Sequence, residues 1–198
     1  MDFLNSKIKH GKLFIVSAPS GAGKTTLVNA LVESIDIARD LSRLITYTSK
    51  SPRANERQGI DYHFIGHQDF ENKIQEGFFL EWSNAYGAYY GIGATLLDEL
   101  ALGKSFIAVV DRAGAQAIQQ KVTGAVLIWI YTKNVLVLRE RLHSRGTETL
   151  QEIEGRLSLA QKELDEEIKQ KLFQYYIHND LFENSLRELE KIINIYLA

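Results

Sequence analysis

Cysteine is absent from the 198 residues of the sequence. This absence excludes disulfide frameworks, zinc fingers, iron–sulfur centres and thiol nucleophiles, and it favours a reducing, cytoplasmic setting. The longest apolar runs, such as residues 125–131, are far shorter than the roughly 20 residues that cross a bilayer, and the N-terminus lacks the apolar segment of a secretory signal. The formal net charge is only −2, so no excess of one sign indicates binding to nucleic acid or to membranes. We therefore expect neither kind of partner.

Apolar segments of strand length alternate with segments of helical pattern. The expected strands are residues 12–17, 105–111 and 125–131, and the expected helices are 25–33, 94–102, 113–121 and 134–144. Because continuous apolar runs are typical of strands buried on both faces, this order predicts an α/β fold with a parallel sheet. Residues 44–90 break the alternation and predict a small inserted α+β lobe with a helix near 68–75. Residues 145–171 predict a charged helix, and 181–197 predict a final amphipathic helix.

A glycine-rich segment follows the first expected strand and opens the first expected helix. It comprises Ala18, Pro19, Ser20, Gly21, Ala22, Gly23, Lys24, Thr25 and Thr26. Its glycines let the backbone curl so that successive N–H groups face one anion, and the helix N-terminus adds partial positive charge. Lys24 offers a charge for the β- and γ-phosphates, and Thr25 offers a hydroxyl for Mg²⁺. The segment predicts a P-loop that binds a nucleoside triphosphate, although Ala18 stands where the general motif has glycine. A turn that merely caps a helix is the alternative.

The P-loop and a series of later motifs, in this order, resemble guanylate kinases. The motifs are GKLFIVSAPSGAGKTTL at 11–27, SPRANERQGIDYHF at 51–64, GFFLEW at 77–82, AYYG at 88–91, RLHSRGTE at 141–148 and HND at 178–180. The resemblance implies one domain over residues 1–198, a P-loop NTPase three-layer sandwich with a parallel sheet. It further implies a core at 11–43 and 104–198 that includes a helical lid at about 142–170, and an acceptor-binding lobe at 44–95. The implied reaction moves the γ-phosphate of ATP to GMP with Mg²⁺, and it leaves monomer and homodimer open.

The acceptor lobe carries groups suited to a phosphate. The guanidinium of Arg53 can make a two-point contact with it, and the hydroxyls of Tyr62 and Tyr90 can donate hydrogen bonds. The resemblance assigns these three residues to the GMP phosphate, although each tyrosine alone is more typical of packing. It also assigns Glu56 to this lobe and Glu81 to the guanine base. A carboxylate can accept hydrogen bonds from the N–H edge of that base.

The resemblance also assigns residues of the second half of the chain. Arg141 and Arg145, four apart on an expected helix, and Arg156 match the lid arginines that close on the phosphates, while pairing with nearby glutamates is the alternative for each. Asp111, at the end of an expected strand, matches the second acidic residue of the family's acid–x–acid strand end, which implies a substrate-binding position near Mg²⁺ or its waters. A helix N-cap is its alternative role. Asn179 matches a residue close to the adenine.

Three residues depart from the family pattern at the acceptor site. Lys50 replaces an arginine and loses its planar fork, Ile92 replaces a guanine-reading hydroxyl, and Val109 replaces an acidic residue. Each lost hydrogen bond to a desolvated partner costs about 1–3 kcal/mol, unless neighbouring hydroxyls such as those of Thr46, Thr48 or Ser49 compensate. Two alternatives to GMP phosphorylation therefore stay open. One is a kinase for ribose 1,5-bisphosphate, whose enzymes the segments YYGIG and DRAGA also resemble, and the other is a non-catalytic binding module.

Overall fold

The computed structural model describes residues 10–34, 41–85, 87–144, 146 and 149–197. Its main sheet is entirely parallel. In spatial order its strands are β2 (Leu41–Arg43), β7 (Ser105–Val109), β1 (Leu13–Ser17), β8 (Val126–Tyr131) and β9 (Tyr175–His178). The three central strands are those that the apolar runs predict, so the α/β class and the parallel sheet are confirmed. The two edge strands, β2 and β9, were not predicted.

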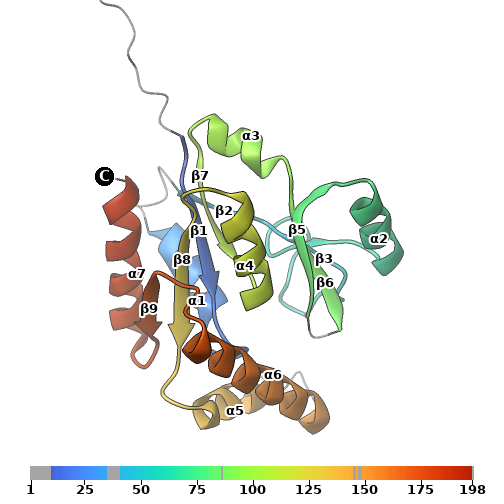
Figure 1. The fold of residues 1–198 in the computed structure, drawn as a ribbon. Coiled ribbons are helices and arrows are strands. Elements are labelled where there is room, and N and C mark those ends of the chain that lie inside the picture. Colours follow the sequence, from blue (N-terminus) through green and yellow to red (C-terminus); the bar gives the residue numbers. More distant parts are fainter. Residues whose placement is uncertain (1–9, 35–40, 86, 145, 147–148, 198) are drawn as a thin grey trace, which may run out of the picture.

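Residues along β1 alternate between the two faces of the sheet, and both faces are covered. Phe14 and Val16 lie in one apolar core, whereas Leu13 and Ile15 lie in the other. The first core is closed mainly by α1 (Lys24–Glu33) and α7 (Phe182–Leu197), and the second by α3 (Leu96–Ala101) and α4 (Arg112–Lys121). Figure 1 shows α4 in front of the sheet. These layers form the expected three-layer sandwich, and the burial of every β1 side chain explains its continuous apolar sequence.

A second, smaller sheet lies beside the first (Figure 1). In spatial order its strands are β4 (His63–Phe64), β3 (Tyr47–Thr48), β6 (Ala88–Gly93) and β5 (Phe79–Ala85). One helix, α2 (His67–Gln75), packs on it through Phe70, whose ring stacks on Phe79 at 4.4 Å and on Tyr89 at 5.2 Å between centroids. The aromatic residues of this segment therefore build a local core that fixes the β5–β6 hairpin.

Two helices follow β8 and pack against each other near the carboxyl ends of the main strands (Figure 1). They are α5 (Val135–Ser144) and α6 (Leu150–Lys169). A capping box begins α6, because the Thr149 side chain accepts from the Glu152 backbone while the Glu152 carboxylate accepts from Thr149. Leu142 and Leu157 join the first core, so both helices are anchored to the sheet. Within the described residues, no helix is both long and apolar enough to span a membrane.

Candidate active site

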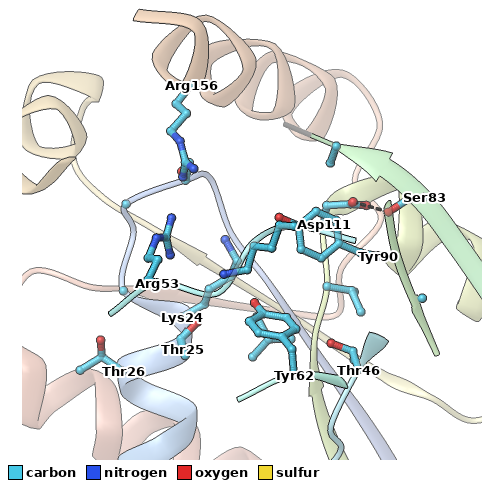
Figure 2. A pocket seen from close by; sticks show the side chains of 18 of the residues that line it. Lys24, Thr25, Thr26, Thr46, Arg53, Tyr62, Ser83, Tyr90, Asp111 and Arg156 are labelled. Atoms are coloured by element: carbon cyan, nitrogen blue, oxygen red, sulfur yellow. Dashed lines mark hydrogen bonds between the residues drawn. The ribbon is translucent and has the colours of Figure 1, made fainter. Parts of the chain in front are cut away.

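One open pocket gathers residues from both sheets (Figure 2). The segment between β1 and α1 lines one side, the β5–β6 hairpin lines the opposite side, and the carboxyl end of β7 lies between them. Arg156 of α6 reaches the same pocket. Ligand sites of α/β proteins lie at the carboxyl ends of strands, and this pocket has that location.

The P-loop forms the first side of the pocket through Ser20, Gly21 and the residues from Gly23 to Thr26. Gly21 and Gly23 have φ angles of 87° and 91°, a left-handed backbone that favours glycine. Gly23 is also the N-cap of α1, so no side chain occupies the donors of the first helical turn. Those donors and the positive end of the helix suit an anion such as a triphosphate.

Arg141 and Asn179 hold the P-loop from behind and do not line the pocket. The Asn179 side-chain amide donates to the Ala22 carbonyl at 2.7 Å, and the Arg141 guanidinium donates to the carbonyls of Ala22 at 3.4 Å and Asn179 at 3.1 Å. A Cβ at Gly23 would lie 2.5 Å from the Asn179 amide nitrogen. The geometry gives both residues a positioning task that the sequence did not indicate. Arg145, the other arginine expected there, lies outside the described residues.

Two cationic side chains lie on the pocket side of the P-loop. Lys24 donates through Nζ to the Ala18 carbonyl at 3.1 Å, and Arg156 donates to the Ser20 hydroxyl at 3.3 Å. Thr25 and Thr26 line the pocket beside Lys24 (Figure 2). Lys24, Thr25 and Arg156 are therefore brought together as the sequence predicts.

A lysine–glutamate pair supports the opposite side of the pocket. The Lys50 ammonium lies 2.6 Å and 2.5 Å from the two carboxylate oxygens of Glu56 and 4.8 Å from the centre of the Tyr62 ring. Glu56 also accepts from the backbone N–H of Arg53 at 2.8 Å. Burial lowers the pKa of Lys50. Burial acts to raise the pKa of Glu56, but the hydrogen bonds from Lys50 and Arg53 together with their positive charges lower it overall. Lys50 and Arg53 line the pocket, while Glu56 holds them in place.

Tyr62 and Tyr90 lie next to these cations, with ring centroids 6.2 Å apart. Both line the pocket (Figure 2). Burial raises the pKa of Tyr62, and it raises the pKa of Tyr90 to about 12. Both phenols therefore stay protonated near neutral pH and are able to donate hydrogen bonds to an anion.

Glu81 is a buried carboxyl group at the far end of the pocket. The residue is 4% exposed, and its Oε2 has no hydrogen-bond partner within the described part of the chain. Burial, together with the nearby charge of Asp111, raises the pKa of Glu81 to about 8. Such an oxygen is costly to bury alone, so it marks a position for a ligand with hydrogen-bond donors.

Asp111 is both a pocket residue and the N-cap of α4. Its Oδ1 accepts from the Gly114 N–H at 2.7 Å, and its Oδ2 accepts from the Ser83 hydroxyl at 2.5 Å. The N-cap role, which the sequence left as an alternative, is therefore present. Ser83 was missed, although strand alternation places it on the same face as Glu81.

The departures from the family pattern occupy different places. Val109 lines the pocket, but Ile92 does not, since it is 1% exposed and lies in the second core. Of the three hydroxyls expected to compensate, only Thr46 lines the pocket. Thr48 donates to the Tyr89 carbonyl at 2.8 Å, and Ser49 accepts from the Tyr89 N–H at 2.9 Å. The expectation that position 92 faces the acceptor is wrong, because its side chain packs into the core.

Two buried glutamates of α6, also missed, lie behind the pocket. Glu167 accepts from the Arg112 guanidinium at 3.1 Å and from the Tyr176 hydroxyl at 2.5 Å, which ties α6 to the residue after Asp111. Burial, partly offset by Lys24, raises the pKa of Glu163 to about 7. Helical spacing on α6 puts both residues on its inner face, but it does not distinguish a buried carboxyl from a solvated one.

Comparisons with known proteins agree on one family. The profile described as guanylate kinase matches residues 10–196. A guanylate kinase of Nitrosospira multiformis is 39% identical over 184 residues, covering 92% of this chain and 85% of its own. A guanylate kinase of Bdellovibrio bacteriovorus is 38% identical over 191 residues, covering 94% and 98%. The crystal structure of guanylate kinase from Anaplasma phagocytophilum has the same fold, with a TM-score of 0.75 at 22% identity over 96% of this chain and 87% of that one.

Proposed function

The chain belongs to the guanylate kinase family, and we propose that it transfers the γ-phosphoryl group of ATP to GMP, giving ADP and GDP. The observation that carries this proposal is the pocket itself. The P-loop lines one side of the pocket. The opposite side carries cationic and phenolic side chains together with a buried carboxyl group. Two anionic substrates can therefore meet in one cavity with their phosphates between these groups.

The P-loop side is the ATP site of this proposal. The N–H groups of residues 20–26 bind the β- and γ-phosphates, and Lys24 adds a positive charge to them. Arg156 approaches from α6 and stabilises the charge on the transferred group, together with Arg145 of the lid. Arg141 and Asn179 fix the loop from behind, and Asn179 contributes to the adenine end of the site.

A magnesium ion fits the oxygen ligands available beside the P-loop. Thr25 lines the pocket next to Lys24, and hydroxyl and phosphate oxygens are the hard ligands that Mg²⁺ prefers. When bound, Mg²⁺ neutralises negative charge on the ATP phosphates, and Thr25 would hold it there.

The opposite side binds the acceptor. Arg53 and Lys50 face the phosphate of GMP as cations, and Tyr62 and Tyr90 donate hydroxyl hydrogen bonds to it. Glu56 acts through Lys50 and Arg53 as a positioning residue. Because a phosphate acceptor is already anionic near neutral pH, the reaction depends on alignment and charge neutralisation rather than on a strong base.

Glu81 and Thr46 recognise the base in this proposal. Glu81, which is protonated near neutral pH in the free protein, gives up its proton when guanine binds. The ionised carboxylate then accepts hydrogen bonds from the N1–H and the amino group of guanine, while the Thr46 hydroxyl offers a donor for its carbonyl. One of these two N–H donors supplies the partner that Oε2 lacks among the described residues. Neither the sugar-bisphosphate alternative nor the binding-module alternative is favoured by the family comparisons.

The proposal includes the division into core, acceptor lobe and lid. The lobe at 44–95 and the lid at 142–170 close on the rest of the core, at 11–43 and 104–198, when both nucleotides bind, which excludes water from the phosphoryl group. A cytoplasmic setting completes it, in keeping with a sequence that contains no cysteine.

An acceptor profile tests the proposed function. ADP release from ATP and Mg²⁺ would be measured with GMP, dGMP, AMP, UMP, CMP and ribose 1,5-bisphosphate. We expect GMP to give the highest kcat/KM, Lys24→Ala to lose nearly all turnover, and the exposed control Lys133→Ala to keep it. Turnover of another acceptor without stimulation by GMP would refute the assignment.

A further inference from the structure

Ser83 occupies a position on β5 that points into the acceptor side of the pocket. Glu81, Ser83 and Ala85 alternate along the strand and line the pocket, while Trp82 and Asn84 are exposed and do not line it. Ser83 pairs with Tyr90 in the antiparallel register of β5 and β6. The hydroxyl therefore lies on the same face as the group that we assign to the acceptor phosphate (Figure 2).

The hydrogen bond to Asp111 fixes the polarity of this hydroxyl. Asp111 uses one carboxylate oxygen for the Gly114 N–H and the other for Ser83, at 2.5 Å. Both oxygens of Asp111 are acceptors, so the single hydrogen of the Ser83 hydroxyl points at Asp111. The remaining lone pairs of Ser83 can only accept hydrogen bonds, and they require an N–H or O–H donor.

Ser83 belongs to one cluster with the unpartnered oxygen of Glu81. A Cβ at Gly114 would lie 3.1 Å from Glu81 Oε2 and 3.4 Å from Asp111 Oδ1, so both carboxyl groups approach the same point of α4. Ser83 bonds to one of them and is two residues from the other on one strand face. The far end of the pocket thus presents adjacent acceptor atoms and is suited to a ligand edge rich in donors.

The nearby positions do not offer this chemistry. Val109 is an apolar lining residue, and Ile92 is buried in the core. The amino group of guanine has two hydrogens, of which ionised Glu81 takes one together with N1–H. The second hydrogen is left for an acceptor beside Glu81, and Ser83 is the hydroxyl on that strand face.

We propose that Ser83 is a specificity-determining residue whose oxygen accepts a hydrogen bond from the amino group of the acceptor base, with Asp111 as the positioning residue that holds its hydroxyl in the accepting orientation. This inference rests on the proposed function, since it requires a guanine nucleotide in the pocket. It assigns the recognition of the amino group to β5 rather than to position 92 of β6.

Inosine 5′-monophosphate, which lacks only that amino group, provides the test. The Kd values of GMP and IMP, from titration calorimetry, and kcat/KM, from ADP release, would be measured for the full chain and for Ser83→Ala. We expect Ser83→Ala to lower kcat/KM and affinity for GMP about tenfold, as for the loss of one hydrogen bond, and to change the values for IMP less than about twofold.

Asp111→Asn gives an independent arm. Asparagine keeps the helix cap by accepting from Gly114, but its NH₂ then donates to Ser83 and turns the hydroxyl hydrogen toward the ligand. GMP binding should weaken and the preference for GMP over IMP should fall, as in Ser83→Ala. The matched control is Asn84→Ala, on the exposed side of the same strand, which should leave both nucleotides unaffected.

The outcomes of these measurements distinguish a failure of the Ser83 role from a failure of the proposed function. If the unaltered protein phosphorylates GMP but Ser83→Ala weakens GMP and IMP in parallel, or weakens neither, the role of Ser83 is wrong and the kinase assignment survives. If the unaltered protein does not act on GMP, the proposed function fails, and the inference fails with it.

Discussion

Replacing Glu81 by glutamine should stabilise the protein while weakening GMP binding. Glutamine has the same size but does not ionise, and the Oε2 that it replaces has no hydrogen-bond partner within the described residues. The carboxyl group is 4% exposed, and burial with the charge of Asp111 raises its pKa from 4.5 to about 8. Lys121 opposes this increase only in part. Folding therefore disfavours the charged form of Glu81.

The magnitude follows from proton linkage. Between pH 4.5 and 8 the unfolded chain has released this proton and the folded chain retains it, so the free energy of unfolding falls as pH rises. The slope is about 1.4 kcal/mol per pH unit, which gives about 3 kcal/mol at pH 7 as an upper value. The loss begins near pH 4.5 and levels off above pH 8, and Glu81→Gln should not show it.

Urea unfolding from pH 5 to pH 9 would measure this difference. The two proteins should have similar stability at pH 5, and the variant should become the more stable one as pH rises. GMP kcat/KM should fall by about tenfold or more in the variant, because the amide offers one acceptor where ionised Glu81 offers two. Parallel stability curves over this range would refute the reasoning, since they would mean that Glu81 does not retain its proton in the folded chain.

Three further substitutions test the geometry of the pocket. Gly23→Ala forces a side chain into a left-handed backbone and to within 2.5 Å of Asn179, so calorimetric titration should show loss of ATP binding and unfolding should show a cost of roughly 1–2 kcal/mol. Gly114→Ala should raise the KM for GMP several-fold by crowding Glu81, while the melting temperature stays equal or rises because alanine favours helix. Ile92→Thr should lower stability by about 1–3 kcal/mol without improving GMP turnover, because its hydroxyl would be buried in the core.

Sequence patterns predict the main sheet well because burial on both faces leaves a strong signal. Strands β1, β7 and β8 are central and nearly continuous in apolar residues, and each is followed by a helix. The edge strands β2 and β9 are short, and β2 has only one buried residue. At such positions the apolar pattern is too weak to distinguish a strand from a loop.

The two sides of the pocket differ in how far the sequence predicts them. The P-loop side is one continuous segment, so the local sequence alone predicts how its glycines and Lys24 are placed. Arg141 and Asn179, however, hold this loop from positions 119 and 157 residues away from Ala22, and the placement of β9 beside β8 brings Asn179 to Ala22. A sequence motif identifies such residues, but it does not show whether their side chains contact the ligand or support the loop.

The acceptor side is assembled from β5, β6, the end of β7 and the segments that flank β3 and β4, so the side chains of β5 and β6 depend on strand register. Ile92 and Ser83 exemplify this dependence. Ile92 pairs with Glu81 across the hairpin yet packs into the core, while Ser83 reaches the pocket and bonds to Asp111. A polar side chain that is missing at position 92 of β6 can therefore be replaced by Ser83 of the neighbouring strand β5, which lies two residues from Glu81. Guanine recognition in this chain is then a property of the hairpin as a whole, and the apolar residue at position 92 does not by itself argue for a different acceptor.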